Sequence, residues 1–369
     1  MADARLVIGT RKGLFVVARN NGAWAVEHAA LLGEPVTLVL PQSDGGLLVA
    51  VEHGHFGVKL KRSNDGGQTW EERPTPKYPE KPDDVEDLDP VRHEPIPWDV
   101  KTVWALESGG PDNADELWCG TIPGGLFHSV DGGDSWSFVD SLWSHPDRKC
   151  WVGGGADYPG IHSVVVDPRN SDVIRIGVSC GGVWISEDRG AVWRCYGEGM
   201  RAEYMPPDQA YDMRTQDPHR LVQCRTSPER LWVQHHNGIF RSDDCGLHWT
   251  EIEEAGPSTF GFGVVVDPND PDTAWFVPAV RDDERYPVDG KLVVTRTSDG
   301  GQSFETLTKG LPQEHAYDLV FRHGLAIDDQ GETLGFGSST GNLWISEDRG
   351  DSWSHVSGSL PPIYCVRFC

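Results

Sequence analysis

The sequence predicts an all-β fold in which residues 1–369 form one domain, a single seven-bladed β-propeller. Three observations predict it. A turn motif recurs six times, with successive copies starting 49 to 66 residues apart, a spacing that fits one four-stranded sheet and its loops. A short apolar strand precedes each copy. The 43 glycines, 26 prolines and 15 tryptophans are typical of short strands joined by tight turns and packed through large side chains.

The repeated motif has the pattern Ser/Thr-x-Asp-x-Gly-x-x-Trp, with Phe in place of Trp in one copy. An Asp carboxylate accepts hydrogen bonds from backbone N–H groups of its own turn, and Gly tolerates the positive φ that a tight hairpin requires. The hydroxyl adds a further bond, and the aromatic ring packs beneath the sheet. We therefore expect each copy to stabilise a hairpin. The copies span residues 63–70, 129–136, 186–193, 242–249, 297–304 and 346–353.

These motifs resemble the Asp box of the BNR repeat family, which includes sialidases, certain endoglucanases and a photosystem assembly factor. The similarity extends over nearly the whole chain and implies a sialidase-like propeller. The sialidase signature Arg-Ile-Pro near the N-terminus is replaced by Ile8-Gly-Thr-Arg11, so sialidase activity itself is not expected. The boxes lie in hairpins far from the family's active sites, so they indicate the fold and not the reaction.

A seventh copy of the strand and turn lies near the N-terminus. The strand 12–16 is followed by Asn20-Asn21-Gly22-Ala23-Trp24, a turn that has lost its Asp. Seven copies predict seven blades. The first blade then lacks its innermost strand, which residues 362–368 at the C-terminus can supply. We expect this strand to close the ring, because closure removes the exposed sheet edges that an open ring would leave.

Composition and charge exclude several classes of partner. The formal net charge of −25 argues against nucleic acid and against an anionic membrane, because both need a basic surface. The chain has no run of about 18 apolar residues and no signal-peptide pattern at its N-terminus. Its eight cysteines are scattered and form no Cys-x-x-Cys pair, which favours reduced thiols. We therefore expect a cytoplasmic protein.

The lengths of the loops predict which face of the ring binds a ligand. The turns after the innermost strands are short and begin at Asp167, Asp217 and Asp267 in three of the blades. The longer insertions fall in connections on the opposite face, and repeat proteins usually build their binding surface from such loops. These insertions span residues 73–97, 141–160, 197–208, 279–290 and 311–322.

Ionisable side chains are expected around the mouth of the channel on this face. Counting five residues back from the Asp of each turn leads to His162, Asp212 and His323, which we predict to be a catalytic acid–base set. Further aromatic and cationic side chains are predicted to bind the substrate, namely Trp98, Lys101, Tyr211, Phe262, Arg281, His315 and Tyr317. This combination predicts a hydrolase or lyase that acts on a carbohydrate-like small molecule.

Two alternatives stay open. In the first, His53, His55, His235 and His236 bind a divalent metal ion, Zn²⁺ or Mn²⁺, for which imidazole is a suitable ligand. No other cofactor is expected. In the second, the propeller is a non-catalytic ligand-binding, protein-binding or assembly protein, because polar channel mouths also occur in propellers without activity. The ionisable mouth favours a small-molecule ligand.

Overall fold

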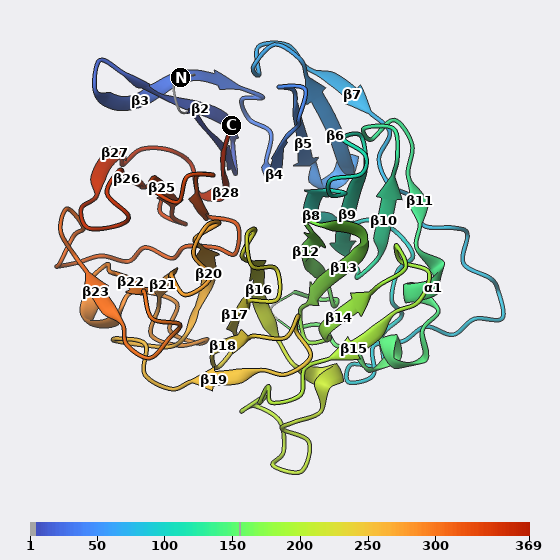
Figure 1. The fold of residues 1–369 in the computed structure, drawn as a ribbon. Coiled ribbons are helices and arrows are strands. Elements are labelled where there is room, and N and C mark those ends of the chain that lie inside the picture. The colour runs from blue at the N-terminus through green and yellow to red at the C-terminus, as the bar shows by residue number, and fades with distance from the viewer. Residues whose placement is uncertain (1–4, 155) are drawn as a thin grey trace.

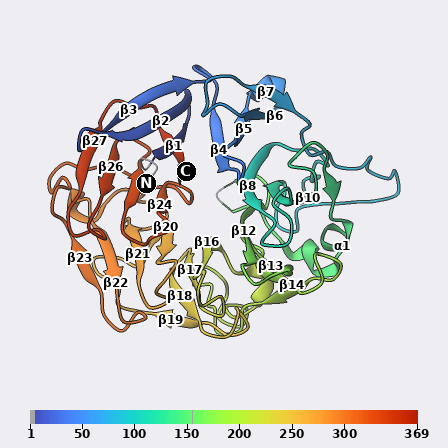
Figure 2. The same ribbon diagram turned by 45° about the horizontal axis from the view of Figure 1, so that its top comes forward.

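The computed structural model describes residues 5–154 and 156–369. Within these residues the strands form seven four-stranded antiparallel sheets, which are arranged as blades around a central axis (Figure 1). Figure 2 shows the same ring tilted by 45°, with β4, β8, β12 and β16 near the axis. The predicted seven-bladed β-propeller is confirmed. None of the helices in the described part of the chain is long and apolar enough to cross a membrane.

Each blade is built from an innermost to an outermost strand, and only the first blade takes strands from both ends of the chain. The first three blades are β28 (Ile363–Phe368), β1 (Arg5–Thr10), β2 (Gly13–Asn20), β3 (Ala23–Ala30); β4 (Val36–Pro41), β5 (Leu47–Glu52), β6 (Val58–Ser63), β7 (Glu71–Arg73); and β8 (Thr102–Ser108), β9 (Leu117–Ile122), β10 (Leu126–Ser129), β11 (Ser137–Phe138). The fourth and fifth blades are β12 (Ile161–Asp167), β13 (Asn170–Val178), β14 (Gly182–Ser186), β15 (Arg194–Tyr196); and β16 (Pro218–Gln223), β17 (Leu231–His235), β18 (Gly238–Ser242), β19 (Thr250–Ile252). The last two are β20 (Gly261–Val266), β21 (Ala274–Pro278), β22 (Val294–Thr297), β23 (Glu305–Leu307); and β24 (Leu325–Ile327), β25 (Leu334–Gly337), β26 (Leu343–Ser346), β27 (Ser354–Ser357). Short helical turns lie in the connections, namely η1 (Gly54–Phe56), α1 (Asp140–Trp143), η2 (Pro146–Cys150), η3 (Met213–Thr215) and η4 (Val288–Gly290).

The C-terminal strand closes the ring, as predicted. β28 pairs antiparallel with β1, and the register places Ile8 opposite Val366. Just beyond the strands, the Arg11 N–H donates to the Pro362 carbonyl at 2.9 Å. Ile8, Ile363 and Val366 are buried together in one apolar cluster. The first and last strands of the chain therefore share a ladder and a core (Figure 1).

The repeated turn has the hydrogen bonds expected from its residues. In the first copy the Ser63 hydroxyl donates to Asp65 Oδ1 at 2.7 Å and accepts the Gly67 N–H at 2.8 Å. Asp65 also accepts the Thr69 N–H at 2.9 Å, and Gly67 has a φ of 92°. The Thr69 and Ser63 bonds hold the pKa of the Asp65 carboxyl below its ordinary value. The same backbone bonds recur at Asp131, Asp188, Asp244, Asp299 and Asp348.

Tryptophan side chains fill the space between neighbouring blades. Trp118 of the third blade and Trp184 of the fourth are fully buried in one cluster, and Trp232 and Trp275 are buried in later blades. Each such ring removes a large apolar area from water, so the inter-blade layers supply much of the folding free energy. The eight cysteines all lie within the described residues and are free thiols, as expected.

The innermost strands carry bulges near their starting ends, where the long loops lead in. In six blades the pairing of the innermost strand with its neighbour slips by a residue. A bulge bends the strand and redirects the side chain of the extra residue. The extra residues at these bulges are Thr37, Trp104, His162, His219, Phe262 with Gly263, and Tyr364. They provide a repeated position from which side chains reach the mouth of the channel.

The fifth blade differs from the prediction. The turn after its innermost strand was expected at Asp217, but β16 only begins at Pro218. The prediction was wrong because Asp-Pro resembles the start of a turn, whereas this carboxylate instead accepts the N–H of Cys180 from the neighbouring blade at 3.0 Å. Proline is tolerated as the first residue of a strand. The position assigned to Asp212 therefore belongs to His219. In the fourth and sixth blades the turns are where they were predicted.

Candidate functional site

A cavity of about 460 Å³ opens where several of the long loops converge, and we call it the central cavity. Four of the loops predicted to form the binding face line it, 141–160, 197–208, 279–290 and 311–322, together with bulged residues of the innermost strands. The face predicted from loop length therefore carries a cavity. Its polar and aromatic lining residues are Trp104, Cys180, Tyr204, Asp217, His219, His236, Phe262, Asp282, Arg285 and Arg322.

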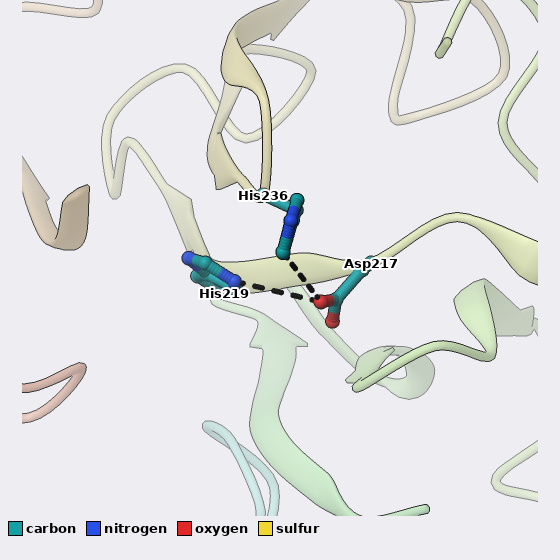
Figure 3. A group of neighbouring side chains, drawn as sticks. All are labelled: Asp217, His219 and His236. Atoms are coloured by element: carbon teal, nitrogen blue, oxygen red, sulfur yellow. Dashed lines mark ion pairs between the residues drawn. The ribbon is translucent and has the colours of Figure 1, made fainter. Parts of the chain in front are cut away.

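Asp217 is the buried carboxylate of this cavity. It lies directly before β16, where its Oδ1 accepts bonds from the Ser179 hydroxyl at 3.1 Å and the Cys180 N–H at 3.0 Å. Its Oδ2 lies 3.5 Å from His219 Nε2 and 3.3 Å from His236 Nδ1 (Figure 3). Burial opposes ionisation of Asp217, but the two imidazoles outweigh this effect and hold its pKa well below the ordinary value. The site therefore contains a fixed negative charge.

His219 is the bulged residue of β16, and its ring is held on two sides. It stacks on Phe262 with 4.4 Å between ring centroids and 14° between planes. Its Nδ1 lies 2.7 Å from the Gly261 carbonyl oxygen, and because a carbonyl only accepts, Nδ1 carries the proton and donates it. The remaining nitrogen, Nε2, points toward Asp217. Burial lowers the pKa of His219 despite the nearby carboxylate.

His236 follows β17 and is the more accessible of the two imidazoles, with 24% of its side chain exposed. Burial lowers its pKa, but the hydrogen bond and negative charge of Asp217, together with the charge of Asp282, outweigh burial, so the pKa is raised. Its outer nitrogen, Nε2, lies 4.0 Å from Asp282 Oδ2. His236 therefore stands between a buried carboxylate and a more exposed one.

Two arginines bring positive charge to the central cavity. The Arg322 guanidinium lies 4.7 Å from the ring centroid of Trp104 and 5.1 Å from that of Phe262. Its Nε has no hydrogen-bond partner within residues 5–154 and 156–369. Burial lowers the pKa of Arg322 to about 10, so it remains charged at neutral pH. The Arg285 guanidinium lies 5.3 Å from the ring centroid of Phe262 and pairs with Asp282.

A second and larger cavity, of about 750 Å³, adjoins the central cavity because the two share Trp104 and Arg322. Glu52, His53 and the bulged residue Tyr364 also line it. The two cavities together offer room for a ligand longer than the central cavity alone would hold.

The structure places two of the predicted catalytic residues inside the ring wall. His162 is fully buried, with Nδ1 2.9 Å from the Ser163 hydroxyl. His323 borders the second cavity, where its Nδ1 accepts a bond from Arg220 at 3.0 Å and its Nε2 donates to the Trp104 carbonyl at 2.9 Å. Burial holds the pKa of both histidines well below the ordinary value. Both rings are thus neutral and tied into the wall of the channel.

The third predicted catalytic residue, Asp212, lies in a different group of side chains. It caps η3 and forms a two-bond pair with Arg214, at 2.9 and 2.7 Å. That arginine also reaches Asp147 at 3.4 Å. Asp212 lines neither of the two cavities, so the structure does not bring the predicted acid–base set together.

Of the predicted substrate-binding residues, the structure places Phe262 in the central cavity. Trp98 donates to Asp87 at 2.9 Å and packs on Trp143 instead. Lys101 pairs with Asp99 at 2.8 Å. The remaining candidates are exposed on the loops and line neither cavity, namely Tyr211, Arg281, His315 and Tyr317.

The structure also places the four predicted metal ligands in different surroundings. His236 lies in the central cavity, His53 pairs with Glu34 at 2.9 Å, and His55 is exposed. His235 is buried, and its Nε2 accepts the N–H of Asp217 at 3.0 Å.

Sequence reasoning missed three of the main residues of the site, Asp217, His219 and Arg322. The signal available for the first two was the pattern Asp-Pro-His at the start of a strand, which the supposed turn concealed.

Comparisons with known proteins support the fold and give one distant sequence relationship. No protein-family model matches the chain. An oligoxyloglucan-reducing end-specific xyloglucanase of Emericella nidulans is 24% identical over 263 residues, which cover 68% of this chain and 27% of the relative. A probable enzyme of the same description from Neosartorya fischeri is 25% identical over 286 residues, 70% of this chain and 32% of the relative. The chain thus spans about a third or less of the curated relatives it matches.

Solved structures have the same architecture at low sequence identity. An ancestral GH74 enzyme superposes with a TM-score of 0.56 at 16% identity, covering 88% of this chain and 39% of that chain. A periplasmic gluconolactonase of Pseudomonas aeruginosa gives a TM-score of 0.55 at 13% identity and covers 99% of this chain and 98% of that one. The chain is therefore a seven-bladed β-propeller that is distantly similar in sequence to these xyloglucanases and shares its fold with the solved structures.

Proposed function

We propose that the protein is a hydrolase or lyase that acts on a carbohydrate-like small molecule bearing a negative charge, and that the central cavity is its active site. The observation that carries this proposal is the convergence of Asp217, two histidines and Arg322 in one cavity with aromatic walls. Ionisable groups with shifted pKa values that lie together in a cavity of this size are typical of binding and active sites. The distant similarity to xyloglucanases supports a sugar-like substrate.

In this proposal the aromatic rings and the arginines bind the substrate. Trp104 lines both cavities and presents an apolar ring face of the kind on which a sugar ring packs, whereas Phe262 is buried against His219 and forms part of the cavity wall. Arg322, held between these two rings, offers guanidinium donors to an anionic group such as a carboxylate. The partial burial of Arg322 strengthens that attraction, because the local dielectric constant is lower than that of water. We therefore infer that the ligand carries its negative charge close to its sugar-like ring.

The reacting part of the substrate would face Asp217 and its two histidines. Hydrolysis and elimination both need a group that removes a proton from water or from carbon, and a positive centre beside the oxygen that becomes negative. A carboxylate with two imidazoles can remove this proton directly. It can also hold a metal ion, which lowers the pKa of a bound water molecule. Either route places the chemistry beside Asp217 and leaves Arg322 to bind and orient the substrate.

The proposal is tested with matched pairs of sugars that differ only in a carboxylate, such as glucuronides and the corresponding glucosides. Turnover is followed by mass spectrometry and binding by calorimetry. We expect the carboxylated member to bind and react, and Asp217→Asn to abolish turnover. Arg322→Gln should weaken binding of that member by about ten- to a hundredfold, the value of one charge-assisted contact. Arg225→Gln, an exposed arginine paired with Asp329, is the control.

The alternative, a non-catalytic binding propeller, gives a different result in the same experiment. It predicts saturable binding that depends on Arg322 but no conversion of any sugar by the wild-type protein. Equal binding of both members of each pair, or equal binding by the wild type and Arg322→Gln, would contradict the assignment of Arg322 to a negatively charged substrate.

A further inference from the structure

We propose that Asp217, His219 and His236 bind one divalent transition-metal ion at the central cavity. Their ligand atoms, Oδ2, Nε2 and Nδ1, all lie within 4.8 Å of one another. The carboxylate oxygen lies 3.5 Å from one imidazole nitrogen and 3.3 Å from the other (Figure 3). A tetrahedral ion with ligands at about 2.1 Å holds neighbouring ligand atoms roughly 3.4 Å apart. The two oxygen–nitrogen distances thus already match the spacing of a coordination sphere, and the two nitrogens lie within 4.8 Å of each other.

The tautomer of His219 supports the same conclusion. Its Nδ1–H is donated to the Gly261 carbonyl, so a neutral ring presents a lone pair at Nε2. That lone pair faces a carboxylate oxygen of Asp217, which also has only lone pairs to offer, so the two atoms need a positive centre between them, either a proton on Nε2 or a metal ion. Both side chains are more than nine-tenths buried, with 2% and 4% exposed, so water cannot readily separate them. A cation between the two acceptors would satisfy both.

Each of the three side chains also has a polar neighbour at the atom that does not face the proposed ion. The second oxygen of Asp217 accepts bonds from the Ser179 hydroxyl and a backbone N–H, and the second nitrogen of His219 donates to a carbonyl. The outer nitrogen of His236 faces the carboxylate of Asp282 at 4.0 Å. Metal-binding histidines usually donate their other N–H to a carbonyl or carboxylate, which fixes the tautomer and raises the basicity of the ligand. His219 makes this hydrogen bond, whereas for His236 the Asp282 carboxylate lies nearby at 4.0 Å, beyond hydrogen-bond distance.

The donor set indicates both the type of ion and the type of site. Two imidazoles and one carboxylate suit Zn²⁺ or Mn²⁺, whereas Ca²⁺ and Mg²⁺ prefer oxygen ligands alone. Three protein ligands are the number found in catalytic zinc sites, which keep a position for water or substrate. Here that position would face the central cavity, because His236 and Asp217 both line it.

The experiment uses the full chain after dialysis against a chelator, titrated with Zn²⁺ and with Mn²⁺ in a calorimeter and analysed for bound metal by mass spectrometry. We expect one ion per chain and a rise in melting temperature on binding. His236→Gln and Asp217→Asn should each weaken binding at least a hundredfold. Asp282→Asn, which removes the charge beside His236 and the partner of Arg285 but no metal ligand, should weaken it by about ten- to a hundredfold.

Two controls keep the result interpretable. His355→Gln and Asp112→Asn remove an exposed histidine and an exposed carboxylate elsewhere and should bind metal like the wild type. Circular dichroism verifies that each variant is folded; if Asp217→Asn does not fold, His236→Gln and Asp282→Asn decide the question. No stoichiometric binding of either ion by the wild type, or undiminished binding by His236→Gln, would overturn the proposal. Metal binding without turnover would contradict the proposed function and leave the metal site standing.

Discussion

The His219 ring stacks on the Phe262 ring across the boundary between the fifth and sixth blades, with 4.4 Å between centroids and 14° between planes. Both residues occupy the bulges of their innermost strands. The stack, together with the bond to the Gly261 carbonyl, leaves the ring of His219 little freedom to turn away from Asp217. The propeller therefore positions a polar side chain by packing it against the same structural position of the next blade.

This relationship predicts that Phe262→Leu weakens metal binding more than it weakens the fold. An aromatic-to-aliphatic change that keeps an apolar side chain costs about 1 kcal/mol of unfolding free energy. Loss of the flat surface should allow the His219 ring to rotate and lower Zn²⁺ affinity by about tenfold, as for other groups that orient a ligand. Urea unfolding and calorimetry measure the two effects. Phe336→Leu, in the buried core of the seventh blade, should reduce stability similarly and leave Zn²⁺ affinity unchanged.

The sequence contained most of the information about the fold because each blade repeats one local pattern. Ser63, Asp65 and Gly67 lie within five residues of one another, and their hydrogen bonds can be predicted from the turn alone. Six such turns and the degenerate seventh copy near the N-terminus gave the blade count. The C-terminal strand then followed by counting strands, and its pairing with β1 confirms it.

The candidate site was less predictable because its residues come together only in the folded ring. Asp217 and His219 are near neighbours in sequence, but Arg322 comes from a connection more than a hundred residues away. Counting back from a turn worked for Phe262, where the turn was placed correctly. It led to Asp212 in the fifth blade, because Asp217-Pro218 resembled a turn. An error of a few residues in the position of a turn therefore selects a side chain on another surface in place of the one at the bulge.

Ring closure predicts that removal of residues 362–369 destabilises the whole propeller. The deletion removes Ile363, Cys365 and Val366, which are at most 1% exposed, and it uncovers the inner edge of β1. Burial of such side chains contributes roughly 1.5–3 kcal/mol each, so the loss approaches the total stability of a typical domain. Thermal unfolding followed by circular dichroism should show a large fall in melting temperature. An unchanged melting temperature would refute the closure argument.

The repeated turns predict a loss of stability in acid. Each of the six turn carboxylates has a folded-state pKa below the ordinary value, because the carboxylate accepts bonds from its own turn. Ionisation therefore favours the folded state above pH about 4, and the contribution is lost as the pH falls from 3.8 toward about 2, the folded-state pKa of Asp299. Melting temperatures between pH 6 and pH 2 should fall most steeply in that window.

Asp299→Asn isolates one turn from the other five. The variant should melt a few degrees lower than the wild type at pH 6, and the difference should shrink by pH 2, where about half of the wild-type carboxyl groups are protonated in the folded state. Asp83→Asn, at an exposed position outside the motifs, is the control and should match the wild type throughout. A difference between Asp299→Asn and the wild type that stays constant with pH would show that the charge of the carboxylate is not what stabilises the turn.

Trp104 and Trp98 lie close together in sequence, yet the structure assigns them different roles. Trp104 borders both cavities beneath Arg322, whereas Trp98 packs on Trp143 and donates to the buried Asp87. We predict that Trp104→Leu weakens binding of a carboxylated sugar by tenfold or more, since it removes both the ring face and the cation–π contact, worth about 1 kcal/mol or more. Trp98→Leu should instead lower the melting temperature and leave ligand affinity unchanged, because it leaves the Asp87 carboxylate with one fewer donor. Calorimetry with each variant measures the binding, and thermal unfolding measures the stability. The opposite pattern would return the substrate-binding role to Trp98, where the sequence had placed it, and would move the active site away from the central cavity.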